Sequence, residues 1–136
     1  MNRIILASHS NLAKGMYDSL KFFNNDIEDS VSYICAYEDG LNFENTLRET
    51  LDHIDGENIL VFTDIIGGSI NQTAVKFLKS YPIHVISGMN LPMLLSVVFA
   101  PEEINDKNID AYITQGKDQI VYMNPYMADL DEAHDD

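Results

Sequence analysis

Residues 59–69 of the chain read ILVFTDIIGGS, and this stretch decides the fold. Its first five residues are almost wholly apolar and rich in branched side chains, which is typical of a strand buried on both faces of a sheet. Two glycines then turn the chain into a helix whose inner face would carry Ile70, Ala74 and Phe77. The stretch therefore predicts a central strand, a tight turn and a helix, in that order.

The same order of strand and helix recurs on both sides of this stretch. Short apolar runs predict further strands at residues 3–7, 31–36 and 83–87. Apolar side chains at helical spacing predict helices at residues 10–23, at about 42–54 and after Asn90. Asn42 and Asn90 are the expected N-caps, and Pro92 suits the first turn that follows Asn90. Strands that alternate with helices indicate an α/β fold with a doubly wound, mainly parallel sheet.

The chain beyond Pro101 carries a weaker pattern. A further helix is expected within residues 102–116, and residues 119–123 are predicted to form a last short strand. The sequence contains no repeat and no interdomain linker, so we expect residues 1–128 to form a single domain. Residues 129–136 are rich in carboxylates and are expected to form a frayed, solvated tail.

The composition narrows the classes of function. The 136-residue chain has 22 acidic and 8 basic residues, a net charge of −14 that repels nucleic acid and anionic lipid. This charge serves solubility alone or attracts a basic protein partner, and the composition leaves both open. The apolar stretches are too short for a signal peptide or a membrane span, and the lone Cys35 cannot form a disulfide within the chain. We therefore expect a cytoplasmic protein.

A histidine and a carboxylate follow two of the predicted strands. Ligands of open parallel sheets bind beyond the carboxyl ends of the strands, and His9 is the one histidine of four at such a place. Asp64 directly follows the central strand. A lone histidine is often structural, and Asp64 alone could cap the next helix. As a pair, the carboxylate would hold one ring N–H, which leaves the other nitrogen of a neutral imidazole free to attack phosphorus.

The segment formed by Gly67, Gly68 and Ser69 supplies a possible anion site beside this pair. Glycines let backbone N–H groups approach an anion closely, and the N-terminus of the next helix favours negative charge by about 0.3–1 kcal/mol. A tight connection between strand and helix would use the same residues. The segment is not a nucleotide P-loop, because the glycine spacing differs and no Lys-Ser or Lys-Thr pair follows. We expect no metal and no cofactor.

Three stretches together carry a resemblance to a known family. They are residues 4–9 (IILASH) with 12–15 (LAKG), residues 64–69 (DIIGGS) with Asn71, and residues 88–95 (GMNLPMLL). On these stretches the chain resembles the IIA domains of the mannose-type (mannose, fructose and sorbose) bacterial phosphotransferase system. In such domains the histidine after the first strand accepts a phosphoryl group from the carrier protein HPr and passes it to a IIB domain.

The resemblance implies a role for each candidate residue. His9 would carry the phosphoryl group and Asp64 would orient the ring, while Ser69 and the backbone of Gly67 and Gly68 would receive the phosphoryl oxygens. The resemblance also implies a homodimer in which a C-terminal strand, here residues 119–123, is exchanged between subunits. Pairing of this strand within its own sheet agrees equally well with the sequence.

The chain departs from the family pattern at two positions. Ser10 stands where the family usually has Gly after the histidine, and Ile70 stands where it usually has Pro. These changes bear on helix entry and partner fit, since neither removes a functional group.

The main alternative function is a regulatory or partner-binding module of the same fold without turnover. A phospho-aspartate receiver domain fits less well, because it needs two acidic residues after the first strand.

Overall fold

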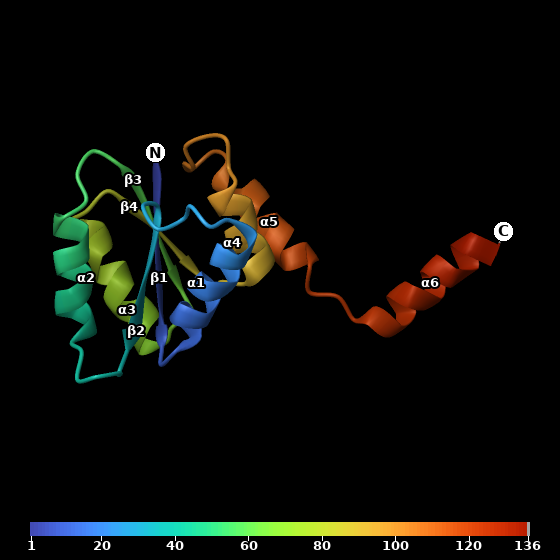
Figure 1. Ribbon diagram of the computed structural model, residues 1–136, viewed down its shortest axis with the longest axis horizontal. Helices are drawn as coiled ribbons and strands as arrows, with labels where there is room; N and C mark the ends of the chain where they lie inside the picture. The colour runs from blue at the N-terminus through green and yellow to red at the C-terminus, as the bar shows by residue number, and fades with distance from the viewer. Residues whose placement is uncertain (136) are drawn as a thin grey trace.

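The structure, a computed structural model, describes the backbone of residues 1–135 and the side chains of residues 1–130. Helices lie on both sides of one sheet, and the last helix stands apart from the rest (Figure 1). No helix within these described residues is long and apolar enough to cross a membrane. The elements are β1 (Asn2–His9), α1 (Leu12–Phe23), β2 (Val31–Ala36), α2 (Phe43–Asp52), β3 (Asn58–Thr63), α3 (Ser69–Lys76), the 3₁₀ helix η1 (Phe77–Lys79), β4 (Ile83–Ser87), α4 (Leu91–Val98), α5 (Ile109–Asp118) and α6 (Met123–Asp135).

The sheet has the strand order β2-β1-β3-β4, and each pair of neighbours is parallel. The chain runs from β1 to β2 on one side and then crosses to β3 on the other, so the winding reverses between β1 and β3. In sheets of this kind the reversal opens a crevice at the carboxyl ends of the two strands. The doubly wound parallel α/β fold predicted from the sequence is confirmed.

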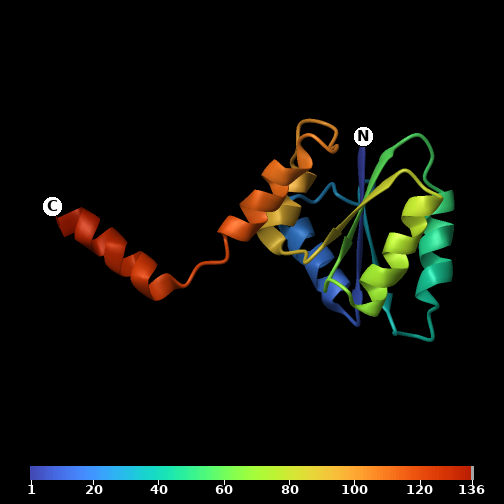
Figure 2. The same ribbon diagram turned by 180° about the vertical axis from the view of Figure 1, so that it is seen from behind.

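Helices cover both faces of the sheet, as the view from behind shows (Figure 2), and an apolar core lies against each face. Side chains of β1 and β3 alternate between the cores, because successive residues of a strand point to opposite faces. Leu6 and Phe62 pack with α1, α4 and α5, whereas Ile5 and Val61 pack with α2 and α3. These four side chains are 0% exposed, and each such burial stabilises the fold by about 1.5–3 kcal/mol. The two central strands are therefore a rigid support for the residues at their ends.

Both asparagine caps that the sequence predicts are confirmed. The Asn42 side chain accepts a hydrogen bond of 3.0 Å from the Asn45 backbone N–H at the start of α2. The Asn90 side chain accepts one of 3.0 Å from the Met93 N–H, and Pro92 lies in the first turn of α4. A cap of this kind stabilises a helix by about 1 kcal/mol, so each helix begins where its cap residue stands.

Helix α1 begins at Leu12, two residues later than expected. The reason is Ser10, whose φ of 52° lies in the left-handed region and cannot belong to a right-handed helix. The Ser8 hydroxyl accepts a hydrogen bond of 2.7 Å from the Ala13 N–H and so satisfies one of the free donors of the first turn. The connection from β1 to α1 is consequently a tight loop directly after His9.

The strand predicted at residues 119–123 does not form in the described chain. The backbone N–H groups of Gln119 and Ile120 instead bond to carbonyls in the last turn of α5, and α6 begins at Met123. The segment leads away from the sheet, so no strand edge lies beside it to pair with (Figure 1). Residues 129–135, expected to be a frayed tail, continue α6, and Asp136 lies outside the described residues.

Candidate active site

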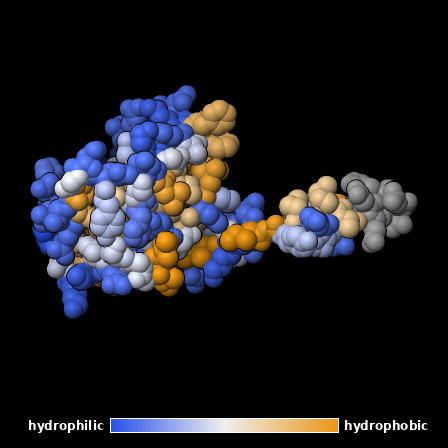
Figure 3. All heavy atoms as spheres, turned by 90° about the horizontal axis from the view of Figure 1, so that it is seen from below, coloured by the Kyte–Doolittle hydropathy of each residue, from blue (hydrophilic) through white to orange (hydrophobic). Residues whose placement is uncertain are grey.

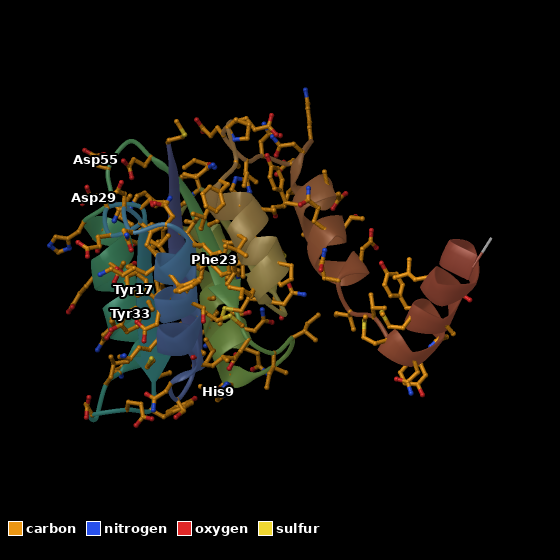
Figure 4. The ribbon with its side chains drawn as sticks, turned by 45° about the vertical axis from the view of Figure 1, so that its right-hand side comes forward. His9, Tyr17, Phe23, Asp29, Tyr33 and Asp55 are labelled. Atoms are coloured by element: carbon orange, nitrogen blue, oxygen red, sulfur yellow. The ribbon has the colours of Figure 1, made fainter. Side chains whose placement is uncertain are left out.

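His9 and Asp64 lie at the carboxyl ends of the two central strands. His9 is the last residue of β1, and Asp64 follows Thr63, which pairs in register with Ala7. Figure 4 shows His9 at the opposite end of the molecule from Asp29 and Asp55. The pair therefore occupies the crevice where the winding of the sheet reverses, as the sequence predicts.

One carboxylate oxygen holds both the backbone and the ring of His9. The Asp64 Oδ2 atom accepts from the His9 backbone N–H at 2.8 Å and lies 2.8 Å from the His9 Nδ1 atom. An ionised carboxylate can only accept hydrogen bonds, so the proton of the neutral ring sits on Nδ1 and the lone pair on Nε2. The Asp64 side chain is 5% exposed and the His9 side chain 38%, so the orienting group is buried and the nucleophile is accessible.

Asp64 is ionised in this setting despite its burial. Burial by itself raises the pKa of the Asp64 carboxyl, but hydrogen bonds from the His9 backbone, the His9 ring and the Ile65 backbone outweigh it. The pKa is held below its usual value of 3.8. A negative charge thus faces the ring at neutral pH, where it would stabilise a positive imidazolium.

Ser69 and Gly68 approach the other side of the ring. The Ser69 Oγ atom lies 3.2 Å from the His9 Nε2 atom, at the first residue of α3. A side chain at Gly68 would place its Cβ 3.3 Å from the His9 Cε1 atom and 3.3 Å from the Ile65 carbonyl oxygen, closer than ordinary contact. A side chain at this position would therefore require the ring or the turn to move by a few tenths of an ångström.

The backbone N–H groups of the two glycines already have acceptors. Gly67 donates to the Asn71 side chain at 3.0 Å, and Gly68 donates to the Ile65 carbonyl at 3.2 Å. Gly67 has a φ of 76°, which turns the chain into α3. The first backbone N–H groups of a helix have no acceptor within the helix. In α3 these are the N–H groups of Ser69 and Ile70, at the end of the helix beside His9. The oxygen-binding role of Gly67 and Gly68 stays a prediction, and the start of α3 offers further donors.

Tyr37 is a site residue that the sequence reasoning missed. It directly follows β2, and its hydroxyl lies 2.5 Å from the Ser69 Oγ atom. Its ring centroid lies 5.6 Å from that of His9. The strand order places β2 beside β1, with Ala36 paired to His9, and this neighbourhood brings Tyr37 to the site. Only the position of Tyr37 after a predicted strand end could have signalled its place there.

The side chains of His53, His84 and Cys35 lie away from this site. The His53 ring contacts the Glu49 carbonyl at the end of α2, and His84 lies within β4, 3.8 Å from Asp106. Cys35 is partly buried in β2. Within the residues that the structure describes, no three His, Cys, Asp or Glu side chains are grouped so that they could hold a metal ion.

A comparison with known protein families identifies the family to which the chain belongs. The family model described as "PTS system fructose IIA component" (EIIA-man) matches residues 3–113, which is most of the chain. The chain belongs to this family. Membership supports a role in a sugar phosphotransferase system and a phosphotransferase function in general. Among curated protein sequences, the comparison found no match.

Solved structures of the phosphotransferase system (PTS) resemble this family member over nearly the whole chain. A candidate phosphoenolpyruvate-dependent sugar PTS permease from Klebsiella pneumoniae superimposes with a TM-score of 0.83 at 28% identity, covering 93% of each chain. The mannose/sorbose specific IIA subunit from Enterococcus faecalis gives 0.76 at 25% identity, covering 88% of this chain and 92% of its own. PTS component EIIA from Streptococcus agalactiae gives 0.77 at 30% identity, covering 92% and 99%.

The structure explains both departures from the IIA pattern. Ser10 adopts a φ of 52°, the region in which glycine is free of strain, and its hydroxyl donates to the Glu38 carboxylate at 2.7 Å. This bond ties the loop after β1 to the loop after β2. Ile70 is the second residue of α3 and is 1% exposed in the core beneath the site. The side chain of Ile70 thus anchors the start of α3 by burial, where proline would do so by its fixed backbone.

Proposed function

We propose that this IIA family member carries a phosphoryl group on the Nε2 atom of His9, accepting it from phospho-HPr and passing it to a IIB domain. The observation that carries the proposal is the contact between His9 Nδ1 and Asp64 Oδ2 at 2.8 Å. It leaves the accessible Nε2 atom as the free nucleophile, beside the hydroxyl of Ser69 and the start of α3.

The transfer step requires no proton movement from His9. The Nε2 lone pair forms the new N–P bond while the bond between phosphorus and the donor breaks, and the electron pair of that bond stays with the donor. The ring becomes positive, and its Nδ1–H remains hydrogen-bonded to the Asp64 carboxylate. The Ser69 hydroxyl and the N–H groups at the start of α3 stabilise the phosphoryl oxygens as charge moves onto them. Transfer to the IIB domain follows the same path in reverse.

The surface around His9 suits protein partners. Ile65 and Ile66 are 59% and 81% exposed in the turn before α3, while Glu38 and Asp39 lie in the loop after β2. Figure 3 looks onto this end of the molecule and shows apolar patches among polar ones. The exposed isoleucines offer apolar contact to a partner. The net charge of −14 attracts a basic face of HPr, an effect that acts over about 8 Å at physiological salt and mainly raises the association rate.

Incubation of the chain with phospho-HPr tests this proposal directly. We expect one phosphate per chain, labile to acid and stable to base, on the peptide that contains His9. We expect the label to move to a IIB domain when one is added. Acid-stable label, or label on a peptide without His9, would contradict the proposal. Binding of phospho-HPr without any label would indicate the regulatory module instead.

We also propose that the chain forms a homodimer through the segment from Ile120 to Leu130, called here the C-terminal arm. The arm projects from the body, with an apolar surface where it leaves (Figure 3). It carries exposed apolar side chains, and α4 and α5 form an apolar groove at its base, lined in part by Leu91, Leu95 and Phe99. In a homodimer, the exposed apolar side chains of one copy's arm would pack into the apolar groove of the other copy. The exposed members of the arm are Ile120, Val121, Tyr122, Met123, Tyr126, Met127 and Leu130.

Substitution of Ile120 by Asp tests the role of the arm. Ile120 is 79% exposed in the single chain, so the change leaves the fold of each subunit intact. We expect sedimentation equilibrium to show a dimer for the parent chain. The dimer of the variant should have a dissociation constant at least about tenfold higher, which is the effect of losing one apolar anchor. Phe22→Asp is the matched control, since Phe22 is 83% exposed on α1 outside the arm. Equal dissociation of both variants, or a monomeric parent chain, would rule the arm out.

A further inference from the structure

Tyr37 extends the contacts of His9 into a chain of four side chains. The Tyr37 hydroxyl lies 2.5 Å from Ser69 Oγ, and Ser69 Oγ lies 3.2 Å from His9 Nε2. On the far side of the ring, His9 Nδ1 lies 2.8 Å from Asp64 Oδ2. The four residues come from the ends of β2, β1 and β3 and from the start of α3.

The charge of Asp64 sets the direction of every bond in this chain. The carboxylate only accepts, so His9 Nδ1 donates to it, and in the neutral ring His9 Nε2 then accepts. Ser69 has a single hydroxyl proton, which it donates to Nε2. The Ser69 Oγ atom can then only accept from Tyr37. The bonds therefore run in one direction, from Tyr37 through Ser69 and His9 to Asp64.

The position of Tyr37 has no explanation in the stability of the fold. The residue is 64% exposed, so it adds little to either core. Its φ of 66° lies in the left-handed region, which is unfavourable for a residue with a bulky side chain. Ser10 and Asp39 also have positive φ, and all three residues lie in the two loops beside His9. Strained backbone that gathers at one site is typical of a functional constraint.

We propose that Tyr37 is a positioning residue that holds the Ser69 hydroxyl on the phosphoryl group of phospho-His9. The proposal rests on the proposed function and adds a residue to it. Once the N–P bond has formed, Nε2 has no lone pair, so the Ser69 proton turns to a phosphoryl oxygen. The Tyr37 hydroxyl continues to donate to Ser69 Oγ, which fixes the Ser69 hydroxyl and strengthens its donation.

The effect favours the phosphorylated state over the resting state. A hydrogen bond to a charged phosphoryl oxygen is stronger than one to a neutral imidazole. Support from Tyr37 is therefore worth more after transfer than before it. Removal of the Tyr37 hydroxyl should lower the equilibrium constant for transfer from phospho-HPr by about two- to threefold, because only the strength that the hydrogen bond gains on transfer enters this constant.

Tyr37→Phe tests this role, because it removes the hydroxyl and keeps the ring. The measurement is the equilibrium ratio of phosphorylated chain to phospho-HPr, in the parent chain and in a Ser69→Ala background. We expect a fall of about two- to threefold in the parent background and no change in the Ser69→Ala background, because Tyr37 acts through Ser69. Tyr33→Phe is the matched control, since Tyr33 is 39% exposed on β2 and packs beside Tyr17 rather than His9.

Each outcome of this cycle decides the role of Tyr37. An unchanged ratio for Tyr37→Phe would overturn it, as would a fall of the same size in the Ser69→Ala background. A parent chain that takes no label on His9 would overturn the proposed function and this role with it. A parent chain that is labelled while Tyr37→Phe has no effect would overturn the role of Tyr37 alone.

Discussion

Replacement of His9 by Gln is expected to reduce phosphoryl transfer from phospho-HPr by at least about a thousandfold. The Gln side chain reaches into the same space and can donate its amide N–H to Asp64, but it has no basic nitrogen that could attack phosphorus. The fold should be retained, because the His9 side chain is 38% exposed and belongs to neither core. The measurement is the amount of acid-labile phosphate on the chain after incubation with phospho-HPr.

His53→Gln is the matched control for this variant. His53 is exposed at the end of α2, and its ring contacts only the carbonyl of Glu49 among the hydrogen bonds of the described residues. We expect parental labelling from His53→Gln and almost none from His9→Gln, with the same circular dichroism spectrum for both. Undiminished labelling of the His9 variant would remove His9 as the phosphoryl carrier.

Asp64→Asn should keep the fold and slow the transfer by about 10²- to 10⁴-fold, as for other carboxylates that orient a catalytic histidine. The amide removes the negative charge that stabilises the positive ring. If its NH₂ group faces Nδ1, the ring proton moves to Nε2 and the nucleophilic lone pair is lost. Single-turnover rates at saturating phospho-HPr measure the effect, because they separate chemistry from binding.

The control for this change is Asp18→Asn, which removes a carboxylate that is 58% exposed and pairs with Lys14 on α1. It reduces the net negative charge by the same amount as Asp64→Asn does. We expect its single-turnover rate to equal that of the parent chain. If Asp64→Asn and the parent chain transferred at equal rates, Asp64 would have no part in the reaction.

Acid titration of the same two variants should separate the charge of Asp64 from its shape. The pKa of Asp64 is lowered in the folded chain, so its ionised form adds stability above the usual value of 3.8, and that contribution is lost as the pH falls through the lowered pKa. Asp64→Asn lacks this contribution at every pH. The difference in unfolding free energy between parent and variant should therefore shrink below about pH 4. The Asp18→Asn variant should keep the pH dependence of the parent.

Local features of the chain could be predicted from the sequence. The central strand, the caps at Asn42 and Asn90 and the order of strands and helices depend on side chains a few residues apart, whose spacing is printed in the sequence. The placement of His9 and Asp64 at one edge followed from a rule about parallel sheets. Residues 119–123 form no strand within the single chain, because no strand edge lies within their reach, and their exchange as a strand in a dimer stays a prediction.

The sequence by itself determined the fold class and the pairing of His9 with Asp64, since both follow from periodicity and from the positions of strand ends. Only the tertiary structure decided that Tyr37 joins Ser69, that the amides of Gly67 and Gly68 already have acceptors, and that Ser10 is left-handed. The physical reason is that these features depend on which strands are neighbours and on how loops from separate strands meet. Contacts between residues 32 or 60 positions apart, such as Tyr37 with Ser69 and Ser69 with His9, leave no periodic trace along the chain.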